Sequence, residues 1–264
     1  MRPNPVRTGL KDGTAVFGTF LMEFATPGVA RLADSAGSQF VFWDLQHTGW
    51  STAEVAPGIA AVHGRAIAAG VRVPQAVPWL IGQALDAGAS LIMVPAVESP
   101  ETAAEIVRAT RYPTATTPDG IRPVTFNFGW DDFRPPTDAA AELEAANDDV
   151  VVFVQIETAR GLDRVEQIAA VDGIDVLWVG DNDLAASLGV AGDFAHPVYL
   201  AALDRVAAAA ATAGKAAGFT TADPAVAEDM LNRGYRVLAF GNDVKVFQAA
   251  LRGGIDAFRA LARK

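Results

Sequence analysis

Short apolar runs alternate along the whole chain with longer segments of helical periodicity. The runs have the length of strands and lie at residues 15–21, 39–45, 70–74, 90–97, 150–157, 175–180, 215–219 and 235–240. They are continuous rather than alternating, as expected for strands covered on both faces. Between them lie Ala-rich segments such as TAAEIVRATRY and AAAELEAAN. Several of the helical segments end at a glycine, where a left-handed C-cap is favoured.

Eight strands alternating with helices in 264 residues predict a (β/α)₈ TIM barrel, a single domain over residues 1–264. The alternative is an open doubly wound sheet, which would normally carry a glycine-rich phosphate turn after its first strand. FGTFLMEFATPG has no G-x-G-x-x-G, so this alternative is weaker. Segment 112–149 is longer than an ordinary connection and rich in proline, and such loops are usually functional or disordered.

Composition excludes several classes of protein. Hydrophobic residues make up 51% and charged residues 20%, the balance of a globular protein. No apolar run approaches the ~20 residues of a membrane span, and MRPNPVRTGLKDG shows no secretory signal, so a cytoplasmic location is expected. A net charge of −10 without a Lys/Arg cluster argues against nucleic acid as a partner. The absence of cysteine excludes thiolate nucleophiles and cysteine metal sites.

Polar residues collect where the predicted strands end. The residues in question are Asp44 and His47 after strand two, Arg72 in strand three, Gln155 and Glu157 at the end of strand five, and Asp181 and Asp183 after strand six. Active sites of barrels lie at this carboxyl rim. Taken singly, Asp183 could be a helix N-cap, Glu157 could favour a helix N-terminus, and His47 could be structural. Arg72 cannot lose its charge, so its burial requires an anion opposite it.

The joint set predicts enolate chemistry. Glu157 and Asp183 offer oxygen ligands suited to Mg²⁺, Mn²⁺ or Co²⁺, with positions left open for substrate. A carboxylate near His47 would raise its basicity as a general base. Arg72 would hold a substrate carboxylate or a developing oxyanion. Together these groups suit proton removal next to a carbonyl, or carbon–carbon cleavage that leaves an enolate.

The same residues carry a family resemblance. FWDLQH, VRVP, LDAGASLIMVPAVESPETAAEIVRATRYP, VQIET and VGDNDLAASLG resemble the HpcH/HpaI aldolases, the class II pyruvate aldolases. The resemblance runs from about Phe17 to the C-terminal helix. It implies a (β/α)₈ barrel whose divalent metal is held at the positions of Glu157 and Asp183.

The resemblance also assigns roles to other positions. His47 and Asp44 match a dyad that works through a metal-bound water as base, and Arg72 matches the arginine of substrate and enolate. Gln155, Gly180 and Asn182 join Arg72 and Asp183 as expected substrate contacts. Asp86, in LDAGA, matches a catalytic acidic residue contributed toward a neighbouring subunit's site. The family is typically hexameric, with the last helix exchanged between neighbours, so a homo-oligomer is expected.

Three departures from the family pattern concern acceptor specificity. Gln46 stands where many relatives have Glu, Asp181 is added in GDNDL, and TATTPDGIRPVTFNFGW replaces a glycine-rich region after RYP. Aromatic residues gather at the end of strand two and in this last segment: Trp43, Trp50, Phe126, Phe128 and Trp130. Trp43 is expected in the core. The segment aromatics fit either a subunit interface or an apolar wall over the acceptor, and the hypothesis is the acceptor wall.

The sequence therefore predicts a metal-dependent aldolase that forms or cleaves 4-hydroxy-2-oxo acids from pyruvate, or hydroxypyruvate, and an aldehyde. A related lyase acting on an acyl-CoA or a dicarboxylate is one alternative. A barrel that only binds a 2-oxo acid is another. A Schiff-base route is the mechanistic rival, but none of the four lysines, Lys11, Lys215, Lys245 and Lys264, sits convincingly in the predicted rim.

Overall fold

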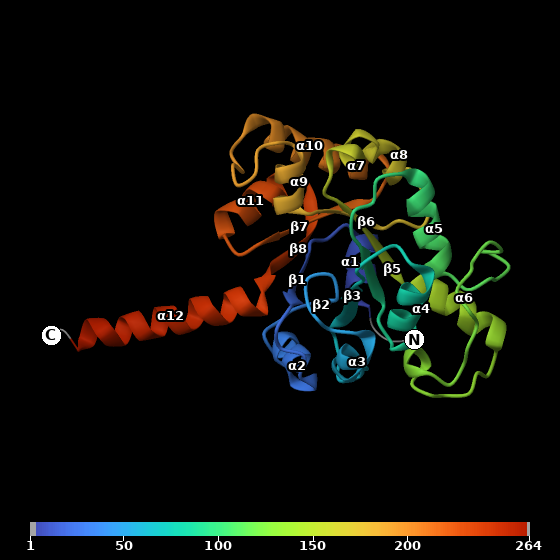
Figure 1. Cartoon of the computed structure of the whole chain (residues 1–264). Helices are drawn as coiled ribbons and strands as arrows, with labels where there is room; N and C mark the ends of the chain where they lie inside the picture. Colours follow the sequence, from blue (N-terminus) through green and yellow to red (C-terminus); the bar gives the residue numbers. More distant parts are fainter. Residues whose placement is uncertain (1–3, 263–264) are drawn as a thin grey trace.

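Eight parallel strands close into a barrel in the computed structural model, which describes residues 4–262 (Figure 1). Each strand pairs with the next in sequence, and β8 pairs with β1. The predicted (β/α)₈ barrel is confirmed. The strands are β1 (Val16–Leu21), β2 (Phe40–Asp44), β3 (Ala68–Arg72), β4 (Leu91–Val94), β5 (Val151–Ile156), β6 (Val176–Val179), β7 (Ala216–Thr221) and β8 (Tyr235–Asn242).

Helices cover most of the outer wall of this barrel (Figure 1). Many begin at a proline in the first turn, where the missing N–H costs nothing. They are α1 (Pro5–Asp12), α2 (Pro27–Ser35), α3 (Thr52–Ala60), α4 (Pro78–Asp86), α5 (Pro100–Thr110), α6 (Ala139–Asp149), α7 (Ala159–Asp163), α8 (Val165–Ala169), α9 (Asp181–Ser187), α10 (Pro197–Thr212), α11 (Pro224–Asn232) and α12 (Asp243–Leu261), with a short 3₁₀ helix η1 (Gly129–Asp131).

The core has two layers because successive side chains of a strand point to opposite faces. Along β2, Phe40 and Phe42 belong to the cluster inside the barrel, whereas Val41 and Trp43 pack outward against helices. The expected burial of Trp43 is confirmed, since none of its surface is exposed. A Cβ on Gly58 of α3 would lie 2.7 Å from the Trp43 ring, so only glycine lets this helix approach.

Several predicted boundaries differ from the structure; β4, for example, ends at Val94 rather than at residue 97. β3 begins at Ala68, before the apolar run 70–74, because Ala68 and Ala69 pair with Phe40 and Val41 of β2. Pairing with a neighbour defines this strand where side-chain propensity alone does not. Segment 112–149 is not irregular throughout, because the predicted AAAELEAAN helix is α6.

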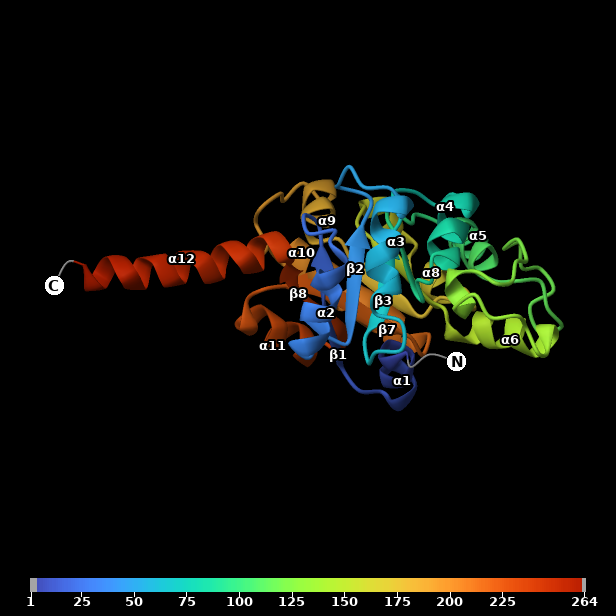
Figure 2. The same cartoon turned by 90° about the horizontal axis from the view of Figure 1, so that it is seen from below.

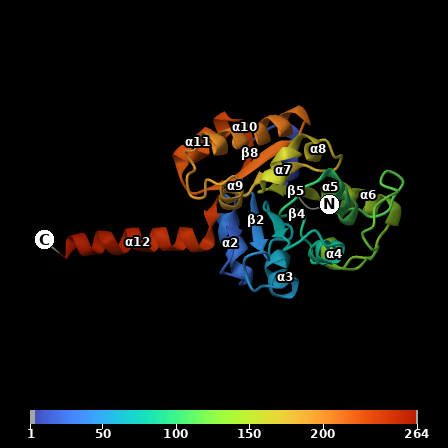
Figure 3. The ribbon, with the colours of Figure 1, turned by 45° about the horizontal axis from the view of Figure 1, so that its top comes forward.

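Helix α12 projects away from the barrel in all three views (Figures 1, 2 and 3). Only its first part packs on the barrel, against β1 and β8. Exposed apolar side chains continue along its length, namely Val246, Phe247, Leu251, Ile255, Phe258 and Leu261. Among residues 4–262, no helix is both long and apolar enough to cross a membrane.

Candidate active site

Arg72 and Asp44 form a buried ion pair at the carboxyl rim of the barrel. β2 and β3 place them side by side, since Asp44 is the register partner of Arg72. The pair is bidentate, with Nε to Oδ1 at 2.9 Å and a terminal guanidinium nitrogen to Oδ2 at 2.7 Å. Asp44 is 0% and Arg72 9% exposed. The anion that burial of Arg72 was expected to require is therefore Asp44.

Asp44 orients Arg72 rather than His47. Its Oδ1 also accepts the Gln46 backbone N–H at 2.9 Å, and its carbonyl oxygen accepts the Thr48 hydroxyl at 2.5 Å. His47 is exposed on the loop after β2. Within residues 4–262 its imidazole makes no hydrogen bond to Asp44. The predicted contact between these two residues is thus absent from the single chain.

An aromatic ring, that of Phe20, completes the setting of Arg72. The guanidinium carbon lies 5.1 Å from the centre of the Phe20 ring, in the geometry of a cation–π contact. Phe20 itself stacks on Phe42 inside the barrel, with ring centres 5.4 Å apart. The ion pair and the ring together leave Arg72 one orientation. Phe20 did not stand out in the sequence, because an apolar residue in a strand normally indicates only core packing.

Glu157 lies buried just beyond β5, with each carboxylate oxygen held by a donor. Oε1 accepts the Ala96 backbone N–H at 2.7 Å, and Oε2 accepts from the side-chain amide of Gln155. Burial raises the pKa of Glu157, and the negative charge of Asp183 raises it further. Ala96 has a φ of 51°, in the left-handed region that is costly for a residue with a Cβ.

Gly180 gives this carboxylate its space. A Cβ there would lie 2.4 Å from Glu157 Oε2 and 2.6 Å from the Gln155 amide nitrogen. Gly180 also precedes α9, which presents Asn182 and Asp183 as exposed side chains at the same rim. Asn182 donates to Asp181 Oδ1 at 3.1 Å, and burial raises the pKa of Asp181. The structure therefore brings Gln155, Glu157, Gly180 and Asp183 together.

The residues at the rim fit a divalent cation that prefers oxygen ligands. Glu157 and Asp183 lie close enough for their charges to interact, and a cation between them would relieve that repulsion. The side-chain oxygen of Gln155 is buried without a partner in the described part of the chain. Residues 4–262 contain no group of three or more His, Asp or Glu arranged to hold a metal. Two protein ligands leave the open positions that a catalytic metal needs.

Asp86 and segment 112–138 lie at the opposite end of the barrel from this rim. Asp86 ends α4 and accepts from Arg122 at 2.8 Å. Arg122 stacks on Tyr112, 4.1 Å from its ring centre, and lies 5.9 Å from the centre of the Trp130 ring. A Cβ on Gly129 would lie 2.8 Å from the Asp86 carbonyl oxygen. Within one chain Asp86 does not reach Arg72 or Glu157.

This placement corrects the expectation that the aromatic segment walls the acceptor side of its own site. The chain returns from α5 to the start of β5 through this segment, so it belongs to the amino end of the strands. A cavity of about 400 Å³ lies there, and Trp130 is among its lining residues. Ala68, Ser90 and Val150 also line it, and they stand at or just before the starts of β3, β4 and β5. The order of predicted elements, a helix before the segment and a strand after it, was the signal in the sequence that could have placed it there.

The lysines are distributed over both ends. Lys11 lies in the last turn of α1 at the amino end, and Lys215 just precedes β7, where its ammonium donates to the Val171 carbonyl and burial lowers its pKa. Lys245 differs from the expectation, since it stands exposed in the first turn of α12 at the carboxyl rim and acts electrostatically on Asp181. Lys264 lies outside the described residues.

Fold and rim define a barrel enzyme whose site combines an arginine–carboxylate pair with oxygen ligands. The HpcH/HpaI aldolase/citrate lyase family matches residues 18–250, and the chain belongs to this family. It is a lyase of the aldolase type.

Relatives support the same assignment over nearly full length. The chain is 36% identical to a hydroxypyruvate/pyruvate aldolase of Paraburkholderia phytofirmans, covering 97% of this chain and 98% of the relative. It is 34% identical to a 5-keto-4-deoxy-D-glucarate aldolase of Klebsiella pneumoniae, covering 97% of both. A crystal structure of a family protein from Burkholderia cenocepacia superposes with a TM-score of 0.90 at 37% identity, covering 97% of this chain and 99% of that one.

Proposed function

We propose that this protein is a divalent-metal-dependent aldolase that forms and cleaves 4-hydroxy-2-oxo acids. The donor is pyruvate or hydroxypyruvate and the acceptor is an aldehyde. The observation that carries the proposal is the buried Arg72–Asp44 pair at the same rim as Glu157 and Asp183. The names of the relatives, a hydroxypyruvate/pyruvate aldolase and a 5-keto-4-deoxy-D-glucarate aldolase, support the substrate class.

Each rim residue has a defined task in this proposal. Glu157 and Asp183 hold Mg²⁺, Mn²⁺ or Co²⁺, and the cation supplies Lewis acidity toward the 2-oxo acid. Arg72, fixed by Asp44, donates to the oxygen that gains charge when the C3 proton leaves. His47 is exposed at the rim and takes that proton. Gln155, Gly180 and Asn182 line the donor end of the site.

Proton exchange into pyruvate tests the proposal without an aldehyde. The protein should exchange the pyruvate methyl protons in deuterated water, and excess EDTA should abolish both exchange and aldol turnover. Mn²⁺, Co²⁺ or Mg²⁺ should restore them. Full activity in EDTA would contradict the metal role, and borohydride trapping of pyruvate on Lys245 would establish a Schiff base instead. Turnover of an acyl-CoA or a dicarboxylate, without exchange into pyruvate, would favour the related lyase.

The oligomer is proposed from two exposed apolar surfaces that match each other. The projecting part of α12 exposes Leu251 at 51% and Phe258 at 73%. On the barrel wall, Phe17 of β1 and Phe240 of β8 are 48% and 56% exposed, on the strands where α12 would complete the ring of helices. We infer that α12 of a second copy covers this strip, as exchanged helices do. A hexamer would then let Asp86 approach a neighbour's site.

Assembly is tested by changing α12 alone. Leu251→Ala combined with Phe258→Ala should dissociate the oligomer in size-exclusion chromatography with light scattering, because it removes two exposed side chains from one apolar stripe. Asp256→Asn, a polar change on the same helix, is the matched control and should keep the native mass. An unchanged mass for the double variant would contradict the exchange of α12.

A further inference from the structure

Asp243, the first residue of α12, holds the loop that follows β1. The residue is buried, and its carboxylate accepts four backbone N–H groups. Oδ1 accepts from Met22 and from Val244, each at 2.9 Å. Oδ2 accepts from Glu23 at 3.0 Å and from Phe24 at 2.8 Å. Three consecutive amides of one loop thus end on a single carboxylate.

Neighbouring contacts tie the same two segments together. The Asn242 side chain donates to the sulfur of Met22 at 3.2 Å and accepts from the Lys245 backbone at 2.9 Å, capping α12. The Phe24 ring packs edge-on against Phe247, one turn into the helix, with ring centres 5.8 Å apart. The direction of α12 and the course of the loop after β1 are therefore one structural unit.

This loop starts beside the candidate active site. It leaves β1 directly after Leu21, and Phe20 in the same strand lies against the Arg72 guanidinium at 5.1 Å. The donor end of the site, with Glu157 and Gln155, is built from β5 and the loop after β4 and makes no contact with Asp243. A shift of the β1 loop would thus alter the mouth of the barrel while Glu157 stays in place.

We propose that Asp243 is a positioning residue that couples docking of α12 on a neighbouring subunit to the shape of the acceptor side of the site. The proposal deepens, and rests on, the proposed aldolase function. When α12 is docked, the carboxylate holds amides 22–24, and the β1 loop presents a fixed wall to the aldehyde. When α12 is free to move, the clamp loosens and the wall loses its shape.

Asp243→Asn tests the clamp, because an amide keeps one acceptor oxygen and turns N–H groups toward N–H donors. Amides 22–24 should exchange hydrogen at least about tenfold faster in the variant. The KM for the aldehyde should rise about tenfold, while pyruvate proton exchange stays within about twofold of wild type. Asp256→Asn, the same change on an exposed part of α12, should alter none of these.

Further outcomes decide the coupling. The Leu251→Ala, Phe258→Ala variant changes only side chains beyond the Phe24–Phe247 contact, and it should also speed exchange at amides 22–24 if undocking α12 loosens the clamp. Unchanged exchange there, in a dissociated protein, would overturn the coupling. Should Asp243→Asn fail to fold, Phe24→Ala removes the ring contact and should raise the aldehyde KM in the same direction. Equal losses in aldehyde turnover and pyruvate exchange would reduce Asp243 to a general structural role. Hydrogen exchange needs no substrate, so failure of the aldolase assignment remains separate.

Discussion

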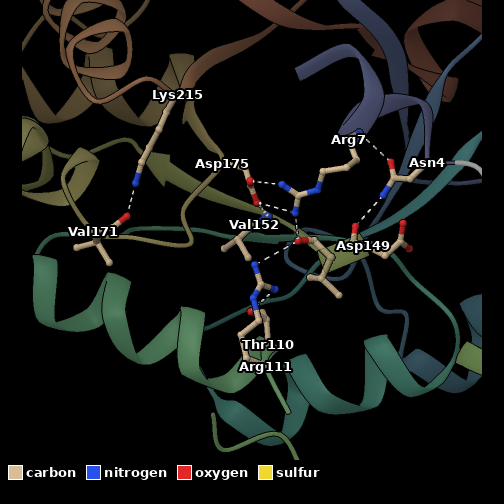
Figure 4. A network of polar contacts seen from close by, with 10 residues as sticks. Asn4, Arg7, Thr110, Arg111, Asp149, Val152, Val171, Asp175 and Lys215 are labelled. Atoms are coloured by element: carbon tan, nitrogen blue, oxygen red, sulfur yellow. Dashed lines mark hydrogen bonds and ion pairs between the residues drawn. The ribbon is translucent and has the colours of Figure 1, made fainter. Parts of the chain in front are cut away.

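The two ends of the barrel both pair an arginine with an aspartate, yet they use the pair differently. At the amino end, Arg7 of α1 contacts Asp175 Oδ1 at 2.5 Å, and Asp175 Oδ2 accepts the Val152 backbone at 2.8 Å (Figure 4). At the carboxyl rim, Arg72 pairs with Asp44. At the same rim, the side-chain oxygen of Gln155 has no hydrogen-bond partner among residues 4–262. One end is closed by a helix, and the other remains open to a ligand.

Backbone carbonyls explain the closure of the amino end. Val150 accepts from both Arg7 and Arg111, and Asn4 donates to the Asp149 carbonyl at 2.9 Å (Figure 4). Burial lowers the pKa of Arg111 to about 10, which still leaves it charged at neutral pH. These contacts join α1, α5 and the starts of β5 and β6. Such polar groups at the amino end of a barrel serve stability, whereas those at the carboxyl rim serve chemistry.

Arg72→Lys should have the largest effect, because it should impair the chemistry of the carboxyl rim while leaving stability nearly unchanged. A point charge replaces a planar fork, so one preorganised donor to the developing oxyanion is lost. We expect pyruvate proton exchange to fall by about 10²–10³. Stability should change far less, because lysine keeps a charge opposite Asp44. Exchange measured by NMR together with thermal unfolding tests this, and an unchanged exchange rate would make Arg72 purely structural.

Arg7→Ala should give the opposite pattern. The change removes a partly buried partner of Asp175 and a donor to Val150, at a cost of about 2 kcal/mol in the free energy of unfolding. Activity per folded molecule should remain at the wild-type value. Urea denaturation and a kinetic assay on the same preparation measure both. Arg259→Ala, which breaks only an exposed pair with Asp256, should cost under about 1 kcal/mol.

Gly180→Ala should act on the metal ligand without breaking the barrel. The added Cβ would meet Glu157 and Gln155, so the carboxylate must turn from its donors. We expect metal affinity to fall about 10-fold, as for changes that misorient a ligand, measured by calorimetric titration. Gly82→Ala in α4 is the control, since its Cβ would meet nothing within 4 Å. Equal affinity in both variants would mean that Glu157 needs no such support.

Ala96→Gly should have the smallest effect, and its sign is informative. Glycine adopts a φ of 51° without the steric penalty that alanine pays, so the substitution lowers the free energy of the folded state. Extra freedom of the unfolded chain offsets part of that gain. We expect a net stabilisation of about 0.5–1 kcal/mol in chemical denaturation. A loss of stability would show that the Ala96 methyl contributes packing that outweighs the strain.

Periodicity and motif spacing by themselves determined the barrel and much of its rim. Apolar runs in helix–strand alternation can be satisfied by few architectures, because each strand must be covered on both faces. Parallel strands also bring their carboxyl ends to one rim, so Arg72, Gln155, Glu157 and Asp183 could be grouped from their places after apolar runs. The need for an anion near Arg72 followed from the fixed charge of the guanidinium.

Only the tertiary structure decided which partners these groups take. Asp44 pairs with Arg72 and not with His47, because register across β2 and β3 places the two side chains opposite each other. The Ala96 N–H that donates to Glu157 and the β1-loop amides that donate to Asp243 are backbone groups, which every residue carries and no sequence pattern marks.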